Sequence, residues 1–181
     1  MENGLETNGG DVSLMLRAKA GDIAAFGELV RAHQNRVMNH LARCGVYTDA
    51  EDIAQEVFVK LWNSRERYTP GAKFTTFLYT IVRRTMIDRI RGNARRTAML
   101  DRYARELETA ENPAPEYCLD EDVAKLLSCL SPEQRETVVL VIMTGMQYNE
   151  AAEVLGIPVG TVKSRISIAL EKMRSLNSRE V

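Results

Sequence analysis

Six arginines gather within fourteen residues near the middle of the chain, where a single aspartate opposes them. The arginines are Arg83, Arg84, Arg89, Arg91, Arg95 and Arg96, and the acid is Asp88. A guanidinium group is planar and carries a fork of donors that matches phosphate oxygens. A cluster so strongly of one sign, built from Arg rather than Lys, favours contact with a nucleic-acid backbone over a solvated charged face.

The residues before the cluster predict the helix that positions it. Its apolar side chains follow the i, i+3, i+4 spacing of a buried helix face, at Phe74, Phe77, Leu78, Ile81 and Val82. The buried first half of such a helix would hold the arginines of its second half in a fixed position. The polar segment before it, residues 64–73, contains Pro70-Gly71 and is expected to be a turn. Tyr68 in this turn either packs onto the domain or offers a surface on which an unpaired base can stack.

A second candidate site lies near the C-terminus, where Lys163, Ser164 and Arg165 cluster at the start of a predicted helix. A preceding helix ends at Leu155-Gly156, and Ile157-Pro158 make the turn between the two. Helix, short glycine-containing turn and helix form the helix-turn-helix pattern, whose second helix enters a DNA major groove. The basic cluster at the correct end favours DNA contact over a purely structural helical hairpin.

Residues 49–63 give the clearest amphipathic pattern in the chain, with Asp49 as its expected N-cap. The apolar stripe predicted to be buried is Ala50, Ile53, Ala54, Val57, Phe58, Leu61 and Trp62. The opposite face carries Asp52, Gln55, Glu56, Val59, Lys60 and Asn63.

The other helix-start and helix-stop residues predict more helices, and no segment has the pattern of a strand. Asp11 and Ser13 are candidate N-caps for a helix through Ala20, and Gly21-Asp22 is a stop followed by a new cap. A long helix is expected from Ile23 to about Cys44, ended by Gly45. Another helix is expected to start at Ser131-Pro132-Glu133 and to continue to Gly145. The fold class is therefore all-α.

The distribution of charge along the chain predicts two domains joined by an acidic linker. Residues 106–122 contain seven acidic side chains and no basic one, between the arginine cluster and the C-terminal basic zone. We expect a disordered tail at 1–11, a first helical domain at 12–97, a flexible acidic linker at 98–119 and a helix-turn-helix domain at 120–177.

The composition also excludes several classes of function. No apolar run reaches the length of a membrane span, and the polar first residues lack the apolar region of a signal peptide, so no membrane insertion and a cytoplasmic location are expected. The spacing of Cys44, Cys118 and Cys129 favours reduced structural thiols over a metal site. His33 and His40 lie seven residues apart and can share a helix face, but without further ligand types nearby no metal is expected. No catalytic constellation or phosphate-binding glycine loop is present, so neither an enzyme nor a cofactor is expected.

Four segments, in this order, resemble the bacterial sigma factors of the extracytoplasmic-function (ECF) branch of the sigma-70 family. They are DAEDIAQEVFVKLW, FTTFLYTIVRRTMIDRIR, LSPEQRE and YNEAAEVLGIPVGTVKSRI. The resemblance covers roughly residues 12–97 and 120–176, which map onto the family's sigma-2 and sigma-4 domains. It implies a dissociable subunit of RNA polymerase that directs the core enzyme to promoters and melts promoter DNA.

The resemblance also implies which residues act. Polymerase contacts, through the clamp helices of the largest subunit, fall on Asp52, Gln55, Glu56, Val59 and Lys60. Sigma-2 contacts with the melted minus-ten element fall on Tyr68, Lys73, Tyr79, Arg83, Arg84, Arg89 and Arg91. Sigma-4 contacts with the minus-thirty-five duplex fall on Thr161, Lys163, Ser164, Arg165, Ser167 and Ile168. The flap of the second-largest polymerase subunit is a further implied partner, and a membrane-bound or soluble anti-sigma factor is a candidate one.

Three positions depart from the family pattern. Phe77 replaces a usual Trp, which is expected to change packing only, and Arg84 replaces a frequent Asn, which leaves base preference open there. After Arg165 the helix continues with Ser167 and Ile168 rather than basic or aromatic residues, so weaker binding to DNA phosphates is expected. Ile168 could instead touch a thymine methyl. A stand-alone helix-turn-helix regulator is the alternative, but it needs no arginine helix beside a base-sized loop.

Overall fold

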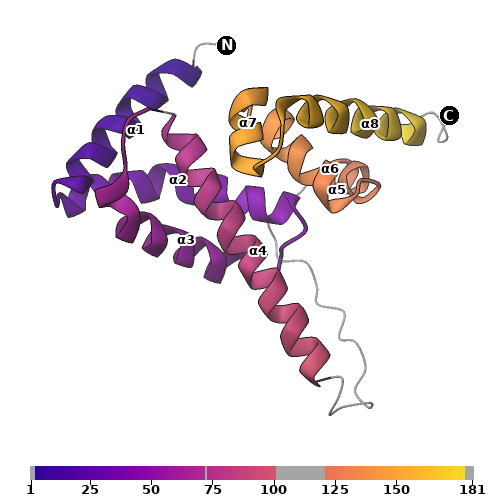
Figure 1. Ribbon diagram of the computed structural model, residues 1–181, viewed down its shortest axis with the longest axis horizontal. Helices are drawn as coiled ribbons and strands as arrows, with labels where there is room; N and C mark the ends of the chain where they lie inside the picture. The colour runs from indigo at the N-terminus through magenta and orange to yellow at the C-terminus, as the bar shows by residue number, and fades with distance from the viewer. Residues whose placement is uncertain (1–2, 72, 101–120, 178–181) are drawn as a thin grey trace.

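The computed structural model describes residues 3–71, 73–100 and 121–177, and every regular element in these ranges is a helix. The elements are α1 (Asn3–Lys19), α2 (Ile23–Arg43), α3 (Ala50–Ser64), η1 (Arg65–Arg67), α4 (Phe74–Leu100), α5 (Glu121–Ser128), α6 (Pro132–Val138), η2 (Val139–Met143), α7 (Tyr148–Leu155) and α8 (Val159–Asn177). α1 to α4 form a first module and α5 to α8 a second (Figure 1). The predicted all-α fold with two helical modules is confirmed for these ranges.

Glycines and caps set the helix ends of the first module much as expected. Gly21 and Gly45 follow α1 and α2 with φ values of 97° and 88°, in the left-handed region that favours glycine. Asp22 caps α2, because its carboxylate accepts a hydrogen bond from the Ala25 amide at 3.0 Å. The apolar stripes of the helices then meet in one core, which includes Met15, Leu29, Leu41, Ile53, Leu61 and Leu78, all fully buried.

The predicted start of α1 is wrong, and the prediction for α3 is right in position but not in its capping hydrogen bond. α1 begins at Asn3, so residues 3–10, expected to be disordered, are helical, and neither Asp11 nor Ser13 is a cap. Asp11 lies inside the helix beside His33, a tertiary contact that local sequence does not reveal. Asp49 occupies the N-cap position of α3 but makes no capping hydrogen bond. Its carboxylate instead accepts a 2.8 Å hydrogen bond from the Asn93 amide of α4.

α4 is the long helix that the arginine cluster predicted. Phe74, Leu78 and Val82 are fully buried along its first half, and its second half projects past the other helices (Figure 1). The helix continues to Leu100, three residues past the expected domain boundary. The rest of the predicted acidic linker, residues 101–119, lies outside the described residues.

The second module begins with a capping box, as its sequence predicts. The Ser131 hydroxyl accepts from the Gln134 amide, and the Gln134 side chain accepts from the Ser131 amide, with Pro132 in the first turn. The expected single helix to Gly145 is divided, because residues 139–143 wind into one π-helical turn after α6. Gly156, with φ 66°, ends α7 and lets the chain turn into α8, which completes the predicted helix-turn-helix.

The two modules pack against each other in this structure. The core of the first module continues through Leu140, Met146, Ala151 and Val162 of the second, and α4 lies against α7. A smaller core cluster, around Leu127, Val139 and Ile166, holds α5, α6 and α8 together. The packing therefore places the base of the arginine helix directly beside the second module.

Candidate nucleic-acid interface

Exposed arginines remain on α4, but fewer than the sequence predicted. Arg84 and Arg91 are exposed, and neither forms an ion pair with any described residue. Both are therefore free to meet phosphate groups. Arg95 and Arg96 belong to the same helix, although their side chains lie outside the described part of the chain.

Two other predicted DNA-binding cations are paired with the second module. Arg83 Nε donates to Glu136 Oε1 at 2.9 Å, and Lys73 Nζ lies 2.9 Å from Glu150 Oε1. Burial raises the pKa of the Glu136 carboxyl, and the positive charges of Arg83 and then Arg165 oppose that rise. These carboxylates occupy the two cations while the modules are packed together.

Arg89 is also paired, here with α3. Arg89 Nη2 donates to Glu56 Oε2 at 3.2 Å, and its other terminal nitrogen lies 4.0 Å from Asp52 Oδ2. Lys60 Nζ lies 2.8 Å from Glu56 Oε1 and donates to the Thr85 hydroxyl at 3.2 Å. The hydrogen bond from Lys60 and then that from Arg89 lower the pKa of Glu56. Glu56 and Lys60 thus help to hold α3 on α4.

An outward-facing line remains on α3. Asp52, Gln55 and Val59 are exposed, with the Asp52 side chain 71% and Val59 59% accessible. Positions i, i+3 and i+7 lie on one face of a helix. An exposed Val beside polar groups on a rigid helix is a suitable protein-docking surface. The exposure predicted for Val59 is confirmed.

Both tyrosines of the predicted site are buried. Tyr68 is 2% exposed, with its ring 5.2 Å from that of Phe77, and its carbonyl accepts from Lys19 Nζ at 2.8 Å. Tyr79 is 5% exposed, and its ring centroid lies 4.9 Å from that of His40. Of the two alternatives for Tyr68, the structure therefore has the packed one, and neither ring offers a stacking surface in this arrangement.

α8 presents most of its predicted contacts to solvent. Lys163, Ser164, Ser167 and Ile168 are exposed, at i, i+1, i+4 and i+5, which is one face of the helix, and Thr161 beside them is half-buried. Arg165 is different. It is half-buried on the side of α6, near enough for its charge to act on Glu133 and Glu136.

Comparison with known proteins decides the family. Residues 29–96 match the model for sigma-70 region 2, and residues 120–173 match the model for sigma-70 region 4. The ECF RNA polymerase sigma-E factor of Haemophilus influenzae is 30% identical over 177 residues, which are 91% of this chain and 94% of that protein. This chain belongs to the ECF sigma factors of RNA polymerase.

Other relatives agree with the assignment of this ECF sigma factor. The ECF sigma factor SigE of Mycolicibacterium smegmatis is 37% identical over 165 residues, although the aligned part spans only 63% of that longer protein. The structure of CnrH in complex with the cytosolic domain of CnrY superposes with a TM-score of 0.69 at 31% identity, covering 95% of this chain and 99% of CnrH. RpoE from Bartonella quintana, in complex with the anti-sigma factor NepR, gives 0.70 at 27% identity, covering 84% and 96% of the two chains.

The sequence did not predict the carboxylates that hold the cations of this ECF sigma factor. Glu136 lies 53 residues from Arg83, and Glu150 lies in the first turn of α7, where an acid is ordinary. No local pattern signals either pairing, because both arise only when the modules pack. Among the described residues, no group of His, Cys, Asp or Glu is placed to hold a metal ion. None of the described helices combines the length and apolar character that a membrane span needs.

Proposed function

We propose that this sigma factor directs core RNA polymerase to specific promoters and opens the DNA there, as a non-enzymatic initiation factor acting in the cytoplasm. The observation that carries the proposal is the combination of three surfaces on one chain. An arginine helix, a helix-turn-helix and a separate docking face on α3 are more than a stand-alone DNA-binding regulator requires. The α3 face and the arginine helix lie in the part that matches sigma-70 region 2, and the helix-turn-helix lies in the part that matches region 4.

We assign polymerase binding to the α3 face. Asp52, Gln55 and Val59 form its accessible line, and they are the residues proposed to meet the clamp helices of the largest subunit. Glu56 and Lys60 stand at the edge of that line and also hold α4. The flap of the second-largest subunit is the proposed contact of the second module.

Reading of the upstream duplex is assigned to the exposed face of α8. Lys163, Ser164, Ser167 and Ile168 are the residues that can reach base edges or phosphates, with Thr161 at their margin. Arg165 supports this helix from its inner side, so its proposed role is positioning rather than base recognition. Ile168 adds an apolar contact that suits a thymine methyl.

Strand opening is assigned to α4 and the loop before it. Arg84 and Arg91 supply contacts to phosphate from the outset, while Lys73, Arg83 and Arg89 join them when their carboxylate partners are released. Tyr68 and Tyr79 act in this proposal as packing supports for the loop and the helix. The base-capturing surface is the exposed turn Thr69–Gly71 beside Lys73.

Release of Lys73 and Arg83 requires the modules to separate, whereas Arg89 is held by α3 within the first module. The two similar solved sigma factors are both bound by another protein, CnrH by CnrY and RpoE by the anti-sigma factor NepR. We propose that an anti-sigma protein is likewise a partner of this chain and favours a packed arrangement of its modules.

The experiment is promoter melting by the reconstituted holoenzyme, read by permanganate reactivity of unpaired thymines. Replacing Thr69–Gly71 with an alanine linker is expected to reduce thymine reactivity more than it reduces closed-complex binding, and a pre-melted template is expected to restore transcription. Equal loss of binding and melting would mean that the loop only supports the fold. Holoenzyme that binds but never makes thymines reactive would contradict the proposed function.

A further inference from the structure

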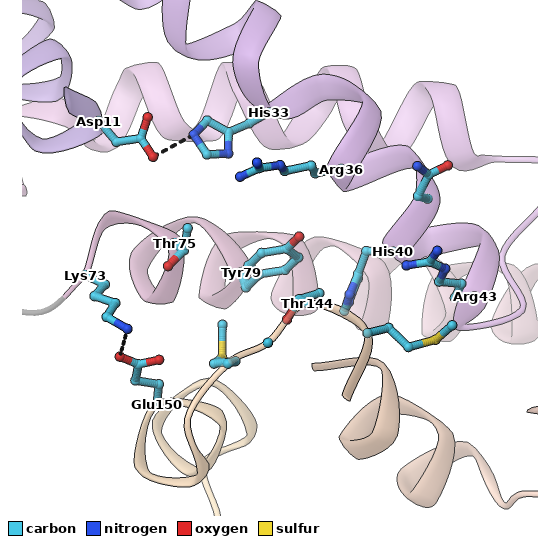
Figure 2. Close-up of a pocket in the computed structure, with 14 residues that line it drawn as sticks. Asp11, His33, Arg36, His40, Arg43, Lys73, Thr75, Tyr79, Thr144 and Glu150 are labelled. Atoms are coloured by element: carbon cyan, nitrogen blue, oxygen red, sulfur yellow. Dashed lines mark ion pairs between the residues drawn. The ribbon is translucent and has the colours of Figure 1, made fainter. Parts of the chain in front are cut away.

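A cavity of about 390 Å³ lies where the two modules meet (Figure 2). α2 and the first turns of α4 form one wall, and the segment from Met143 to Glu150 forms the other. We propose that this cavity binds a small phosphorylated ligand, with Arg36 and Arg43 as its phosphate-binding groups. The two arginines belong to none of the surfaces to which DNA and polymerase binding are assigned, although Lys73 of the strand-opening site also lines the cavity.

Arg36 and Arg43 are the cations of this cavity that lack an anionic partner. They lie seven residues apart on α2, about 10.5 Å along one helix face, and both line the cavity. Neither forms an ion pair within the described ranges. Both charges act on the hydroxyl of Tyr79 between them: burial raises the pKa of Tyr79 to about 12, and Arg36 and Arg43 oppose that rise. Two guanidinium groups without anionic partners along one wall match a ligand with one or two phosphate groups.

The third basic side chain of the wall, apart from the histidines, already has a carboxylate partner. Lys73 is paired with Glu150 at 2.9 Å, and Figure 2 shows this pair at the far end of the cavity. Asp11 Oδ2 lies 3.0 Å from His33 Nε2. Against the single carboxylate of Asp11, the two arginines leave the cavity with a surplus of positive charge.

Two buried histidines leave ring nitrogens without partners along the same wall. His33 and His40 are 1% and 2% exposed. No described residue makes a hydrogen bond with either nitrogen of His33 or with Nδ1 of His40, and the approach of Asp11 to His33 lacks hydrogen-bond geometry. Buried polar atoms are nearly always satisfied, so these nitrogens call for a bound group or water in the cavity. A ring N–H can donate to a phosphate oxygen.

The size of the cavity favours a ligand larger than phosphate itself. Pockets for small molecules begin at about 300 Å³, so this volume suits a nucleoside diphosphate or a similar phosphate ester. Asn39, Thr75 and Thr144 add amide and hydroxyl groups to the walls. Because the walls belong to both modules, a ligand bound here also holds the modules together.

Direct binding to the full-length chain, without polymerase or DNA, tests the site. The probes are pyrophosphate and ADP, titrated calorimetrically at constant ionic strength. The variants are Arg36→Gln and Arg43→Gln, and the matched control is Arg31→Gln, which removes the same charge from an exposed position on the same helix. The chain contains two histidines, so ring resonances of ¹⁵N-labelled histidine report on His33 and His40 directly.

We expect saturable one-to-one binding of at least one probe, weakened about tenfold or more by either cavity variant and unchanged by the control. The histidine ring signals should shift with the same saturation curve. Equal weakening in Arg31→Gln, or unmoved histidine signals, would place the bound phosphate elsewhere on the protein and overturn the proposal. So would the absence of saturable binding by both probes.

Discussion

Arg83 Nε donates a 2.9 Å hydrogen bond to Glu136 Oε1, and this contact ties the arginine-rich helix of the first module to α6 of the second. Lys73 and Glu150 repeat the arrangement at the base of the same helix. Cations that the proposed function assigns to DNA are thus held by carboxylates of the neighbouring module. DNA binding by the packed form should consequently be weaker than the charge of α4 alone implies.

Neutralising these carboxylates should strengthen DNA binding. In the double variant Glu136→Gln/Glu150→Gln, Lys73 and Arg83 are no longer paired with anions. Single-stranded DNA should bind more tightly, with a salt dependence of log K steeper by up to about 1.4, at about 0.7 for each added phosphate contact. Fluorescence anisotropy across a salt series measures both. Glu153→Gln, an exposed change one turn along α7, is the control and should match wild type. Identical slopes in all three proteins would contradict the shielding.

His40 should make the fold sensitive to acid. Burial, and then the charge of Arg43, lowers its pKa from the ordinary 6.5 to about 4. The folded state therefore keeps the ring neutral, while the unfolded chain takes up a proton below about 6.5. Stability should fall as the pH drops from about 6.5 to about 4, by up to about 3 kcal/mol for the full shift. Thermal unfolding of wild type and His40→Phe over this range measures the difference. The variant keeps an aromatic ring beside Tyr79 and should lose less stability; parallel curves would contradict the prediction.

Changes on the exposed line of α3 should weaken polymerase binding without unfolding the helix. Asp52→Lys and Val59→Asp are each expected to reduce affinity for core polymerase by about tenfold or more, because few central residues carry most interface energy. Glu28→Lys, a charge reversal at an exposed position on α2, should leave affinity unchanged. Glu56→Lys should also lower the melting temperature, since Glu56 holds Arg89 and Lys60. Wild-type affinity in both Asp52→Lys and Val59→Asp would remove the assignment of this face.

Lys163 and Arg165 should differ when each is replaced by alanine. Lys163 is exposed on α8, so its loss should cost about 1 to 3 kcal/mol of promoter binding by holoenzyme if it reaches a base, with relaxed preference at one position. Arg165 faces α6, so its loss should lower the melting temperature of the second module and leave base preference intact. Competition binding with a promoter library separates the two effects. If only Arg165→Ala lost base preference, Arg165 rather than Lys163 would be the residue that contacts a base.

Helices, caps and the helix-turn-helix could be predicted because their signals are local. The buried stripes of α3 and α4, the capping box at Ser131 and the left-handed Gly156 all depend on residues a few positions apart. The start of α1 could not be predicted in this way. Asp11 has the residue type of an N-cap, and its contact with His33 of α2 is a tertiary contact that no local pattern signals.

The sequence predicted which residues form the candidate site, but not whether each side chain is paired or exposed. Charge alone marks Arg83 and Arg84 as equivalent, yet packing pairs one with Glu136 and leaves the other exposed. Arg165 and Lys163 differ for the same reason. Pairing depends on which face of a helix meets the other module, and that information lies in long-range contacts rather than in spacing.

Transcription in vitro tests the central claim most directly. Core RNA polymerase with and without this chain would be given fragmented genomic DNA of the source organism, and transcript starts would be mapped. We expect a discrete set of starts that appear only with the chain, share two upstream elements and disappear with Asp52→Lys. Unchanged polymerase output, together with duplex binding by the chain alone, would contradict it and identify a stand-alone DNA-binding regulator.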